Sequence, residues 1–474
     1  MQVTAQAFKA NAAKALRDAD LRQALKRVET NFTSRRAEAV ARLPEFDALR
    51  DAARDIKNHV LANLDFYLEN FERRVVEQGG HVHWCKTARE ARETILTLCR
   101  SVDAKTCTKG KSMIAEEIAL NPFLQLSGVR PIETDLGEYI IQLADEPPSH
   151  IIGPAVHKTK DQISDLFLAH HKRYGKTERL TDAQALVNEA REILRQQFID
   201  ADVGITGANF LIAETGSTVI VTNEGNGDLT QTLPRMHIVI ASLEKVVPTL
   251  DDAATILRVL ARSATGQEFS VYTTFSTGPR REGDLDGPNA FHVVLLDGGR
   301  SAMLGTELQD LLRCIRCGAC MNHCPVYHAV GGHAYGWVYP GPIGAALDPH
   351  FIGIEAAQHL PNASTFCGRC EEVCPMRIPL PKIMRYWRER AFAARITPPM
   401  QRAGVELWAW FARNPVFYRL AARVGAALLG RLGRAKGRFN RLPFAAGWTA
   451  SRDLPAPEGA TFIDQWRRRG GAKS

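Results

Sequence analysis

The stretch Cys314-Ile-Arg-Cys317-Gly-Ala-Cys320-Met-Asn-His-Cys324-Pro325 decides the fold of the region around it. Its cysteines have the spacing C-x2-C-x2-C-x3-C-P, which is typical of two-cluster bacterial ferredoxins. In such a run, three closely spaced thiolates bind one cubane and the fourth cysteine normally binds the other. Gly318 permits a tight turn of the backbone, and Pro325 directs the chain away after the last cysteine. The stretch therefore predicts one [4Fe–4S] cluster and a second one nearby.

A shorter run begins about forty residues later, at Cys367-Gly-Arg-Cys370-Glu-Glu-Val-Cys374-Pro375. It has the spacing C-x2-C-x3-C-P, and Ser364 occupies the position at which a complete run would have its first cysteine. If the last cysteine of each run binds the cluster of the other run, each cluster has ligands from both runs. Cluster one is then predicted to bind Cys314, Cys317, Cys320 and Cys374, and cluster two is predicted to bind Cys324, Cys367 and Cys370.

The predicted ligand set of the second cluster lacks one member. The oxygen of Ser364, or a distant residue such as Cys107, would complete a [4Fe–4S] cluster at this site. Without a fourth ligand, the site would hold a [3Fe–4S] cluster or a cubane with one open iron. Zinc is the other metal that clustered cysteines bind, but zinc sites prefer paired C-x2-C units with four ligands each. The spacing therefore favours iron–sulfur clusters over zinc.

Most of the cysteines are crowded into this region, since seven of the ten lie between Cys314 and Cys374. The N-terminus lacks the apolar segment of a signal peptide, so we expect a cytoplasmic chain in which crowded cysteines bind metal rather than form disulfides. The other three, Cys85, Cys99 and Cys107, are expected to be buried or free thiols. No stretch reaches about eighteen uninterrupted apolar residues, which disfavours a transmembrane span.

Apolar patterning divides the chain into four regions. Residues 1–75 have apolar positions at helical spacing, and residues 76–302 alternate short apolar runs with helical stretches, which predicts an α/β domain. Residues 303–392 are rich in cysteine, glycine and proline, and the segment between the two cysteine runs has helical patterns. We therefore expect a helical ferredoxin-type domain there, followed by a basic helical region at residues 393–474.

Runs rich in β-branched and aromatic residues predict strands within the α/β domain. The predicted strands are His81–Cys85, Val129–Glu133, His150–Ile152, Asn209–Ala213, Ser217–Thr222, Met236–Ala241, Phe269–Phe275 and Phe291–Leu296. Helices are predicted at Asp161–His171 and Asp182–Phe198. The run Asn223–Gly227 predicts either a tight hairpin turn or a loop whose backbone N–H groups cradle a phosphate or a carboxylate.

The net charge of +8 is unevenly distributed along the chain. Residues 376–474 contain 20 Lys and Arg against 5 Asp and Glu, which is +15 and leaves −7 for the rest. This region is either a solvated tail or a docking surface for an acidic partner or for anionic lipid at the inner face of the membrane. Its aromatic residues at helical spacing fit a core helix or a helix at a partner or membrane surface. These residues are Trp408, Trp410, Phe411, Phe417 and Tyr418.

Phrases inside and outside the cysteine runs resemble one family, the iron–sulfur B proteins of the bacterial lactate utilization system. The matching phrases are KSM at 111–113, ETDLGEYIIQLADEPPSHIIGPAVHK at 133–158, GANFLIAETGSTVIVTNEGNG at 207–227, HVVLLDGGRS at 292–301, CIRCGACMNHCPVYHAVGGHAYG at 314–336 and YPGPIGA at 339–345. The resemblance covers roughly residues 60–390. It implies a lactate-utilization (LUD) domain related to the sugar-isomerase and CoA-transferase superfamily, followed by two cubane sites.

The resemblance also implies a function, the passing of electrons during oxidation of L-lactate to pyruvate. Two partner proteins are implied with it: a second iron–sulfur or cysteine-rich subunit, and a subunit that consists of a LUD domain alone. A membrane-surface or quinone-linked acceptor would fit the basic C-terminal region. We therefore expect an electron-transfer subunit of an oxidoreductase complex rather than an enzyme that acts alone.

Other functions make different demands on the sequence. A catalytic subunit that oxidises a hydroxy acid would bind its substrate next to the incompletely ligated cluster, with Arg235 or Lys158 paired with the substrate carboxylate. No G-x-G-x-x-G follows a strand, and Lys109-Gly-Lys-Ser112 lacks the upstream glycine of a P-loop, so no nucleotide site is predicted. The basic region has no helix-turn-helix or zinc-finger pattern, so no nucleic-acid partner is expected.

Overall fold

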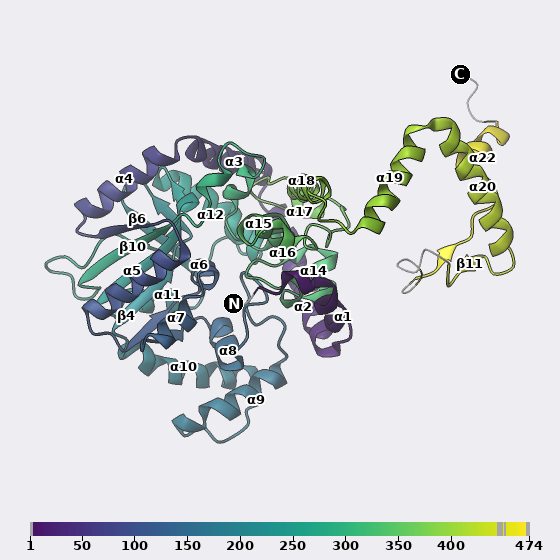
Figure 1. Cartoon of the computed structure of the whole chain (residues 1–474). Coiled ribbons are helices and arrows are strands. Elements are labelled where there is room, and N and C mark those ends of the chain that lie inside the picture. Colours follow the sequence, from purple (N-terminus) through teal and green to yellow (C-terminus); the bar gives the residue numbers. More distant parts are fainter. Residues whose placement is uncertain (1–2, 443–448, 450–451, 471–474) are drawn as a thin grey trace. The chain divides into compact units, whose positions relative to one another are not determined.

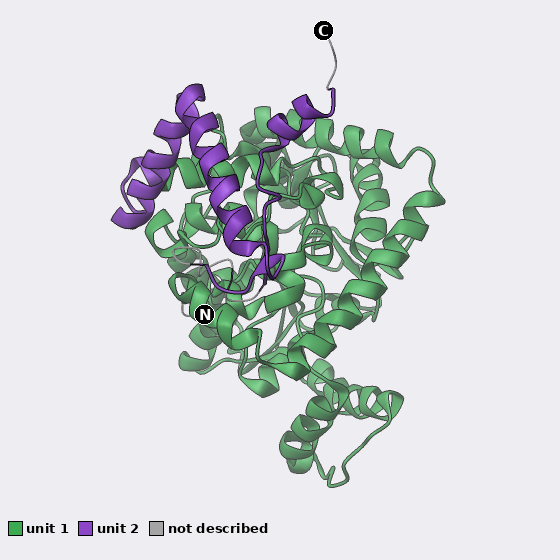
Figure 2. Ribbon diagram, turned by 90° about the vertical axis from the view of Figure 1, so that its right-hand side faces the viewer, with its two compact units in different colours: residues 1–391 green, residues 392–474 purple. Residues whose placement is uncertain are grey.

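The structure, a computed structural model, describes residues 3–442, 449 and 452–470. The chain forms two compact units, Met1–Ala391 and Phe392–Ser474 (Figure 2). The regions 1–75, 76–302 and most of 303–392 fall within the first unit, and the boundaries between them remain predictions. Parts of the first and last predicted regions, residues 1–2, 443–448, 450–451 and 471–474, lie outside the described residues.

Helices form the N-terminal region, as its apolar spacing predicts. They are η1 (Ala5–Ala7), α1 (Phe8–Ala15), α2 (Ala19–Ala41), α3 (Phe46–Ala62) and α4 (Leu64–Glu77). Asp18 caps α2, because its side chain accepts a hydrogen bond from the Leu21 N–H at 2.9 Å. The Thr4 N–H donates to the Gly336 carbonyl at 2.8 Å, so these helices pack directly on the cysteine-rich region.

A six-stranded parallel sheet forms the core of the α/β region (Figure 1). In spatial order its strands are β1 (His81–Cys85), β10 (Ala290–Leu296), β7 (Met236–Ser242), β4 (Val203–Gly207), β2 (Thr106–Lys109) and β3 (Arg130–Glu133). Val294 and Leu296 of β10 pack with α5 (Ala88–Ser101), whereas Val293 and Leu295 pack with α4 on the opposite face. Both faces of β7 and β10 are buried, which is why these two strands have nearly continuous apolar runs.

The order of the strands creates a point at which the direction of winding reverses. The chain passes from β2 outward to β3, and from β4 in the other direction to β7 and then β10. β2 and β4 are neighbours, with Cys107 paired to Val203 and Lys109 paired to Ile205. In open α/β sheets, ligands bind outside the carboxyl ends of the strands at such a reversal.

A smaller four-stranded sheet adjoins the parallel sheet. Its strands are β8 (Val246–Val247), β5 (Phe210–Ile212), β6 (Ser217–Thr222) and β9 (Tyr272–Ser276), in that order. β5 pairs with β8 in parallel, and the remaining pairs are antiparallel. The other elements of the region are α6 (Met113–Glu117), α7 (Leu120–Leu126), α8 (Leu136–Ala144), α9 (Lys160–His171), η2 (Lys172–Tyr174), α10 (Ala183–Ile199), α11 (Asn226–Thr232), η3 (Leu243–Lys245) and α12 (Leu250–Ala264).

Two local predictions are wrong. His150–Ile152 is a turn rather than a strand, because the His150 ring accepts hydrogen bonds from the Ile152 and Gly153 N–H groups at 3.1 and 3.2 Å. Asn223–Gly227 does not close a hairpin, since β6 pairs with β9 and helix α11 begins at Asn226.

Two strands of the parallel sheet, β2 and β4, are absent from the predicted set. β2 is short and contains a charged residue, Lys109, whose side chain is fully buried. Lys109 is paired with Glu133 at 2.9 Å and with Glu116 at 3.2 Å, which compensates the burial of its charge. Sequence patterns that rely on apolar runs miss a strand that buries a charged residue against such tertiary partners.

Helices make up the regular structure of the described residues 303–391. They are η5 (Gln309–Arg313), α13 (Ala319–Asn322), α14 (Pro325–Val330), η6 (His333–Tyr335), α15 (Gly341–Phe351), α16 (Ile354–Ala357), α17 (Arg369–Glu372) and α18 (Leu380–Ala393), preceded by η4 (Ser301–Met303). The Trp387 indole N–H donates to the Ala346 carbonyl at 2.8 Å and fixes α18 on α15. Tyr327, Tyr335 and Tyr339 are fully buried in the core of this region.

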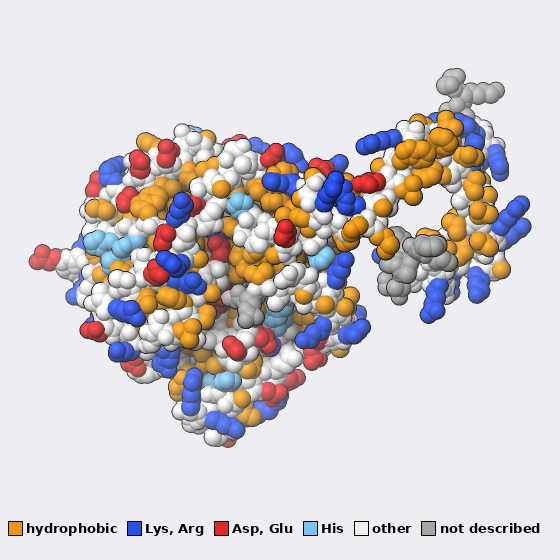
Figure 3. Space-filling model, viewed as in Figure 1, with side chains coloured by type: hydrophobic (Ala, Val, Ile, Leu, Met, Phe, Trp, Pro, Cys, Tyr) orange, Lys and Arg blue, Asp and Glu red, His pale blue; other side chains and the backbone are white. Residues whose placement is uncertain are grey.

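The second compact unit contains α19 (Pro399–Arg413), α20 (Pro415–Gly433), β11 (Arg438–Phe439), β12 (Leu454–Pro455) and α22 (Phe462–Arg468). Helix α19 has no buried residue, and Trp408 and Trp410 are 65% and 51% exposed. Hydrophobic and basic side chains are interspersed on this unit (Figure 3). Among the described residues, no helix is both long and apolar enough to cross a membrane.

Candidate metal centres

The first cavity brings together four cysteines from both runs. Cys314, Cys317, Cys320 and Cys374 line a space of about 20 Å³. Ile151, Ile315, Ile343, Ile378 and Leu380 supply an apolar wall around it. Cys314 follows η5, Cys320 lies on α13 and Cys374 follows α17, so two segments of the chain that are about fifty residues apart meet at one site.

The second cavity brings together the other three cysteines of the two runs. Cys324, Cys367 and Cys370 line a space of about 20 Å³, together with Ser364. The Ser364 hydroxyl accepts a hydrogen bond from the Phe366 N–H at 3.1 Å. Cys367 is exposed, whereas Cys324 and Cys370 are buried.

The two runs share a backbone conformation that suits cluster binding. Gly318 follows Cys317 and Gly368 follows Cys367, and their φ values of +75° and +80° lie in the left-handed region that glycine adopts without strain. The short helices α13 and α17 begin at the next residue. Backbone N–H groups point at sulfur, since Tyr327 donates to Cys324 and Ile378 to Cys374, both at 3.5 Å.

Burial makes the thiolate form of most of these cysteines unfavourable unless a cation compensates its charge. Burial, reinforced by the neighbouring sulfurs, raises the pKa of Cys374 and raises the pKa of Cys370 to about 12. The pKa of exposed Cys367 is lowered by hydrogen bonds from the Arg369 backbone and the Thr365 side chain. Thiolates packed this closely need a compensating metal charge. The donor sets therefore fit iron–sulfur clusters in their ligand type and arrangement.

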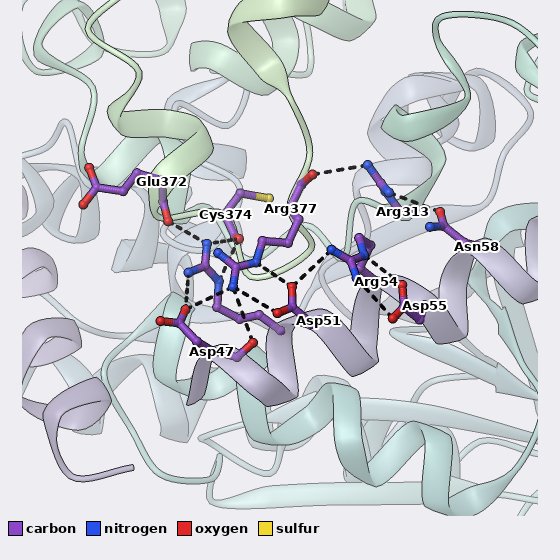
Figure 4. Close-up of polar contacts among 10 residues, drawn as sticks. Asp47, Asp51, Arg54, Asp55, Asn58, Arg313, Glu372, Cys374 and Arg377 are labelled. Carbon is purple, nitrogen blue, oxygen red and sulfur yellow. Dashed lines mark hydrogen bonds and ion pairs between the residues drawn. The ribbon is translucent and has the colours of Figure 1, made fainter. Parts of the chain in front are cut away.

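Buried arginines of the N-terminal helices hold the end of the second run. Arg50 of α3 donates to the Cys374 carbonyl at 2.8 Å and to the Glu372 carbonyl at 2.6 Å, and Arg36 donates to the Val373 carbonyl at 3.0 Å. Figure 4 shows the Glu372 and Cys374 carbonyls turned toward α3, and the sulfur of Cys374 pointing away. These bonds fix the backbone beside a cysteine of the first cavity.

Residues considered as further ligands or substrate partners lie elsewhere. Cys107 is on β2, in the core of the parallel sheet with Cys85 and Cys99, and all three are buried as expected. Arg235 is paired with Asp202 at 3.6 Å, and Lys158 is bonded to Glu146. None of these side chains lines either cysteine cavity.

A larger cavity of about 240 Å³ lies beside the first run. Its lining includes Lys111, Lys245 and Arg316, and Arg316 stands between Cys314 and Cys317. Burial, with repulsion from Arg316, lowers the pKa of Lys245 to about 8. Sequence patterns give no sign of this site, because its cations come from segments far apart in the chain. The Asn223–Gly227 run, considered as an anion cradle, contributes Asn223, Glu224, Asn226 and Gly227 to the lining.

Arg316 belongs to an ionic network of buried side chains. Glu244 lies 3.7 Å from Arg316 and 3.2 Å from Arg300, and all three side chains are at least nine-tenths buried. Arg300 is also paired with Glu117 at 2.6 Å, and Tyr339 donates to Glu117 at 2.6 Å. The network joins the α/β region to the cysteine-rich region. The attraction of Arg300 and Arg316 outweighs burial and lowers the pKa of Glu244 to about 2.

Comparison with known proteins assigns two domain classes to the chain. A LUD domain matches residues 68–296, and a 4Fe-4S dicluster domain matches residues 310–378. The LUD domain contains the parallel sheet, and the dicluster domain contains both cysteine-lined cavities. The class defined by fold and site is therefore an iron–sulfur protein with a LUD domain followed by a 4Fe-4S dicluster domain.

Relatives match over almost the whole chain. Lactate utilization protein B of Geobacillus kaustophilus is 43% identical over 93% of this chain and 92% of its own length. Lactate utilization protein B of Bacillus subtilis is 40% identical over 99% and 98%. The "Uncharacterized electron transport protein YkgF" of Escherichia coli is 40% identical over 97% and 96%. The chain belongs to the lactate utilization protein B family.

Proposed function

We propose that this chain is the iron–sulfur electron-transfer component of L-lactate oxidation to pyruvate within a multi-protein system. The observation that carries the proposal is the pair of cysteine-lined cavities, in which cysteines of the two runs are exchanged. Membership of the lactate utilization protein B family supports lactate as the source of the electrons. The name of the Escherichia coli relative supports electron transport.

Two [4Fe–4S] clusters would occupy these sites. Cluster one would be held by Cys314, Cys317, Cys320 and Cys374, and cluster two by Cys324, Cys367 and Cys370. When bound, each cluster carries one electron, so a pair suits a two-electron oxidation. The residues of the chain would hold the clusters, donate backbone hydrogen bonds to cysteine sulfur and surround the first site with aliphatic side chains.

Ser364 is the proposed fourth ligand of cluster two, or else marks its open corner. Its hydroxyl is in the lining of the second cavity, whereas Cys107 is in the sheet core. Anaerobic iron and sulfide analysis with EPR tests this on the wild type and on Ser364→Ala and Ser364→Cys. If Ser364 is the ligand, the wild type binds about eight irons and Ser364→Ala about seven.

The Ser364→Cys variant is the matched control, because it restores the complete run. We expect it to bind about eight irons whichever state the wild type has. An oxidised three-iron signal in the wild type, converted to a four-iron signal in Ser364→Cys, would mean an open corner. Fewer than about four irons in every variant, or stoichiometric zinc instead, would contradict the proposed electron-transfer function.

The fold of the LUD domain is proposed to be related to the sugar-isomerase and CoA-transferase superfamily. The parallel sheet with its reversal between β2 and β4 supports this relation. The proposed partners are a second iron–sulfur or cysteine-rich subunit and a subunit with a LUD domain alone. Their addition should produce lactate-dependent reduction of the clusters.

A membrane-surface or quinone-linked acceptor is proposed to bind the second compact unit. The protein would then lie peripherally at the inner face of the membrane. Exposed apolar residues alternate with basic ones on α19 and α20, and no residue of α19 is buried in its own unit. Sedimentation of the full chain with vesicles of anionic lipid tests this. Binding to anionic but not to zwitterionic vesicles is expected, because residues 392–474 contain 15 Lys and Arg against 4 Asp and Glu, a net charge of +11.

The alternative is a catalytic subunit that oxidises a hydroxy acid next to an incompletely ligated cluster. The observation in its favour is the cavity of about 240 Å³ beside the first run, although it lies next to Cys314 rather than in the lining of the second site. Turnover of L-lactate by the isolated chain with an artificial acceptor would support this alternative. Turnover only after the partners are added would support the electron-transfer role.

A further inference from the structure

The cavity beside the first cysteine run lies where the topology favours a ligand site. Gly110–Ser112 follow β2, Gly207 ends β4 with Ala208 and Asn209 directly after it, and Lys245 follows β7 by three residues. All of them line the cavity. These are the carboxyl ends of neighbouring strands at the reversal of winding. Ligands of open α/β sheets bind at this position because backbone groups there are left without partners in the sheet.

Three buried polar groups of the lining have no protein partner. Lys245 is 8% exposed, and its ammonium group has no hydrogen bond or ion pair with any residue that the structure describes. The Nη1 of Arg316 and the Oδ1 of Asn226 are also without a partner among the described residues. Buried polar groups in native proteins are normally satisfied, so an unpaired group in a cavity indicates a ligand.

The charges of the lining favour an anion. Lys111 is neutralised by Asp135 at 3.5 Å and also donates to the Ile152 carbonyl at 3.0 Å. Arg316 is only partly compensated, since Glu244 is 3.7 Å from its Nη2 and its guanidinium lies 4.4 Å above the Tyr339 ring. Exposed Glu224 also lines the cavity and adds to the negative charge near Lys111. Lys245 and Arg316 remain the two cationic groups that no carboxylate of the lining pairs with.

The remaining wall limits the size and shape of the ligand. Ile152, Ile220, Ile240 and Leu260 give the cavity an apolar side, which an inorganic anion would not use. Gly227 has no room for a side chain, because a Cβ there would lie 2.9 Å from Thr222 and 3.1 Å from Ile220. A volume of about 240 Å³ admits a small metabolite but not a nucleotide.

We propose that this cavity binds a small organic carboxylate, whose carboxylate group pairs with Lys245 and Arg316 and whose carbon chain contacts the apolar side. The side-chain oxygen of Asn226, Oδ1, is placed to accept a hydrogen bond from a hydroxyl of the ligand. Arg316 stands between two cysteines of the first cavity, so the bound carboxylate changes the charge next to cluster one. The choice of 2-hydroxy and 2-oxo acids as ligands rests on the proposed function, whereas the site itself does not.

The test is isothermal titration calorimetry on the full chain, purified anaerobically and loaded with its clusters. L-lactate and pyruvate are the probes, and lactamide is the neutral control with the same shape. We expect both carboxylates to bind and lactamide not to bind. Propionate is a third carboxylate probe. The inference would be overturned if lactamide bound as tightly as the acids, or if L-lactate, pyruvate and propionate all failed to bind.

Variants locate the site. Lys245→Met removes the unpaired cation at nearly constant volume and should raise Kd about tenfold or more. Lys158→Met is the matched control, because this lysine is outside the cavity and is bonded to Glu146. Unchanged Kd in Lys245→Met, or an equal loss in Lys158→Met, would contradict the assignment. Lys111→Met provides a second cavity variant if Lys245→Met does not fold.

A spectroscopic measurement links the cavity to cluster one. Pyruvate should shift the EPR signal of one of the two reduced clusters in the wild type and leave it unchanged in Lys245→Met. Iron and sulfide content, measured on the same samples, separates the two proposals. Two clusters without carboxylate binding would overturn this inference alone, whereas carboxylate binding by a chain that holds no clusters would overturn the proposed function alone.

Discussion

The two cysteine-lined cavities differ in how far they are shielded from water. The first is lined mainly by aliphatic side chains, and of its cysteines Cys317 and Cys374 are buried while Cys314 and Cys320 are half-buried. The second includes exposed Cys367 and polar neighbours such as Ser364 and Thr365. The two runs are similar in sequence, so their different surroundings come from what packs on each of them.

Elements outside the dicluster domain explain this difference. Helix α3 supplies Arg50 to the Cys374 carbonyl, and the turn at His150 bonds to Asn322 at 2.8 Å within the first run. The cavity of the second run is lined by residues of the dicluster region alone. The first site is thus held by contacts from outside the dicluster domain, whereas the second has one exposed cysteine, Cys367, although Cys324 and Cys370 are buried. We expect the first to matter for folding and the second mainly for its own cluster.

The largest expected effect separates the two sites directly. Cys320→Ser should lower the iron content by about half or more and destabilise the whole unit, because this cysteine belongs to the enclosed cavity. Cys367→Ser should lose iron only from the second site and keep a thermal unfolding midpoint close to that of the wild type. Iron analysis and thermal unfolding under anaerobic conditions measure both quantities. Equal loss of stability in the two variants would break the comparison.

A smaller effect tests the contribution of helix α3 to the first site. Arg50→Met leaves the Cys374 and Glu372 carbonyls without their donor, and should lower the free energy of unfolding by about 2–3 kcal/mol. Arg54→Met on the same helix removes only exposed pairs with Asp51 and Asp55, and should cost less than about 1 kcal/mol. Urea unfolding gives both values. Similar costs for the two arginines would show that the buried bonds are not what stabilises this end of the run.

The smallest effect concerns the segment that packs on the first run from the α/β side. Hydrogen bonds from His157 and Lys158 lower the pKa of Glu146 to about 2 from 4.5. Because the pKa is lowered in the folded state, the ionised carboxylate of Glu146 stabilises the fold above pH 4.5. This stabilisation is lost as the pH falls from 4.5 toward 2. Because this carboxylate is partly exposed, we expect about 1–2 kcal/mol at neutral pH.

Glu146→Gln should remove that contribution at neutral pH and make unfolding less dependent on pH between 4.5 and 2. The matched control is Glu192→Gln, which breaks an exposed pair with Lys176 and should change little. Urea midpoints of the wild type and both variants, compared at each pH, test the sign. A Glu146→Gln variant that is as stable as the wild type at neutral pH would contradict this prediction.

The sequence predicts the sheet and the helices well where apolar patterning is strong. The N-terminal helices and the strand at Met236–Ala241 are examples, since burial alone decides them. Patterning fails at β2, whose Lys109 is buried against Glu133, and at His150, whose ring bonds to its own turn and to Asn322. In these places polar contacts with distant residues decide the local conformation, and no local pattern contains them.

The sequence by itself determined the chemistry of the cysteine runs, because the spacing of thiols along a few residues sets which metal groups they can hold. Only the tertiary structure decided which site has an exposed cysteine, and it alone brought Lys245 and Arg316 to one cavity. Those properties depend on contacts between segments that are far apart in the chain. Such contacts arise from the packing of α3 and the parallel sheet against the dicluster region, which short motifs do not encode.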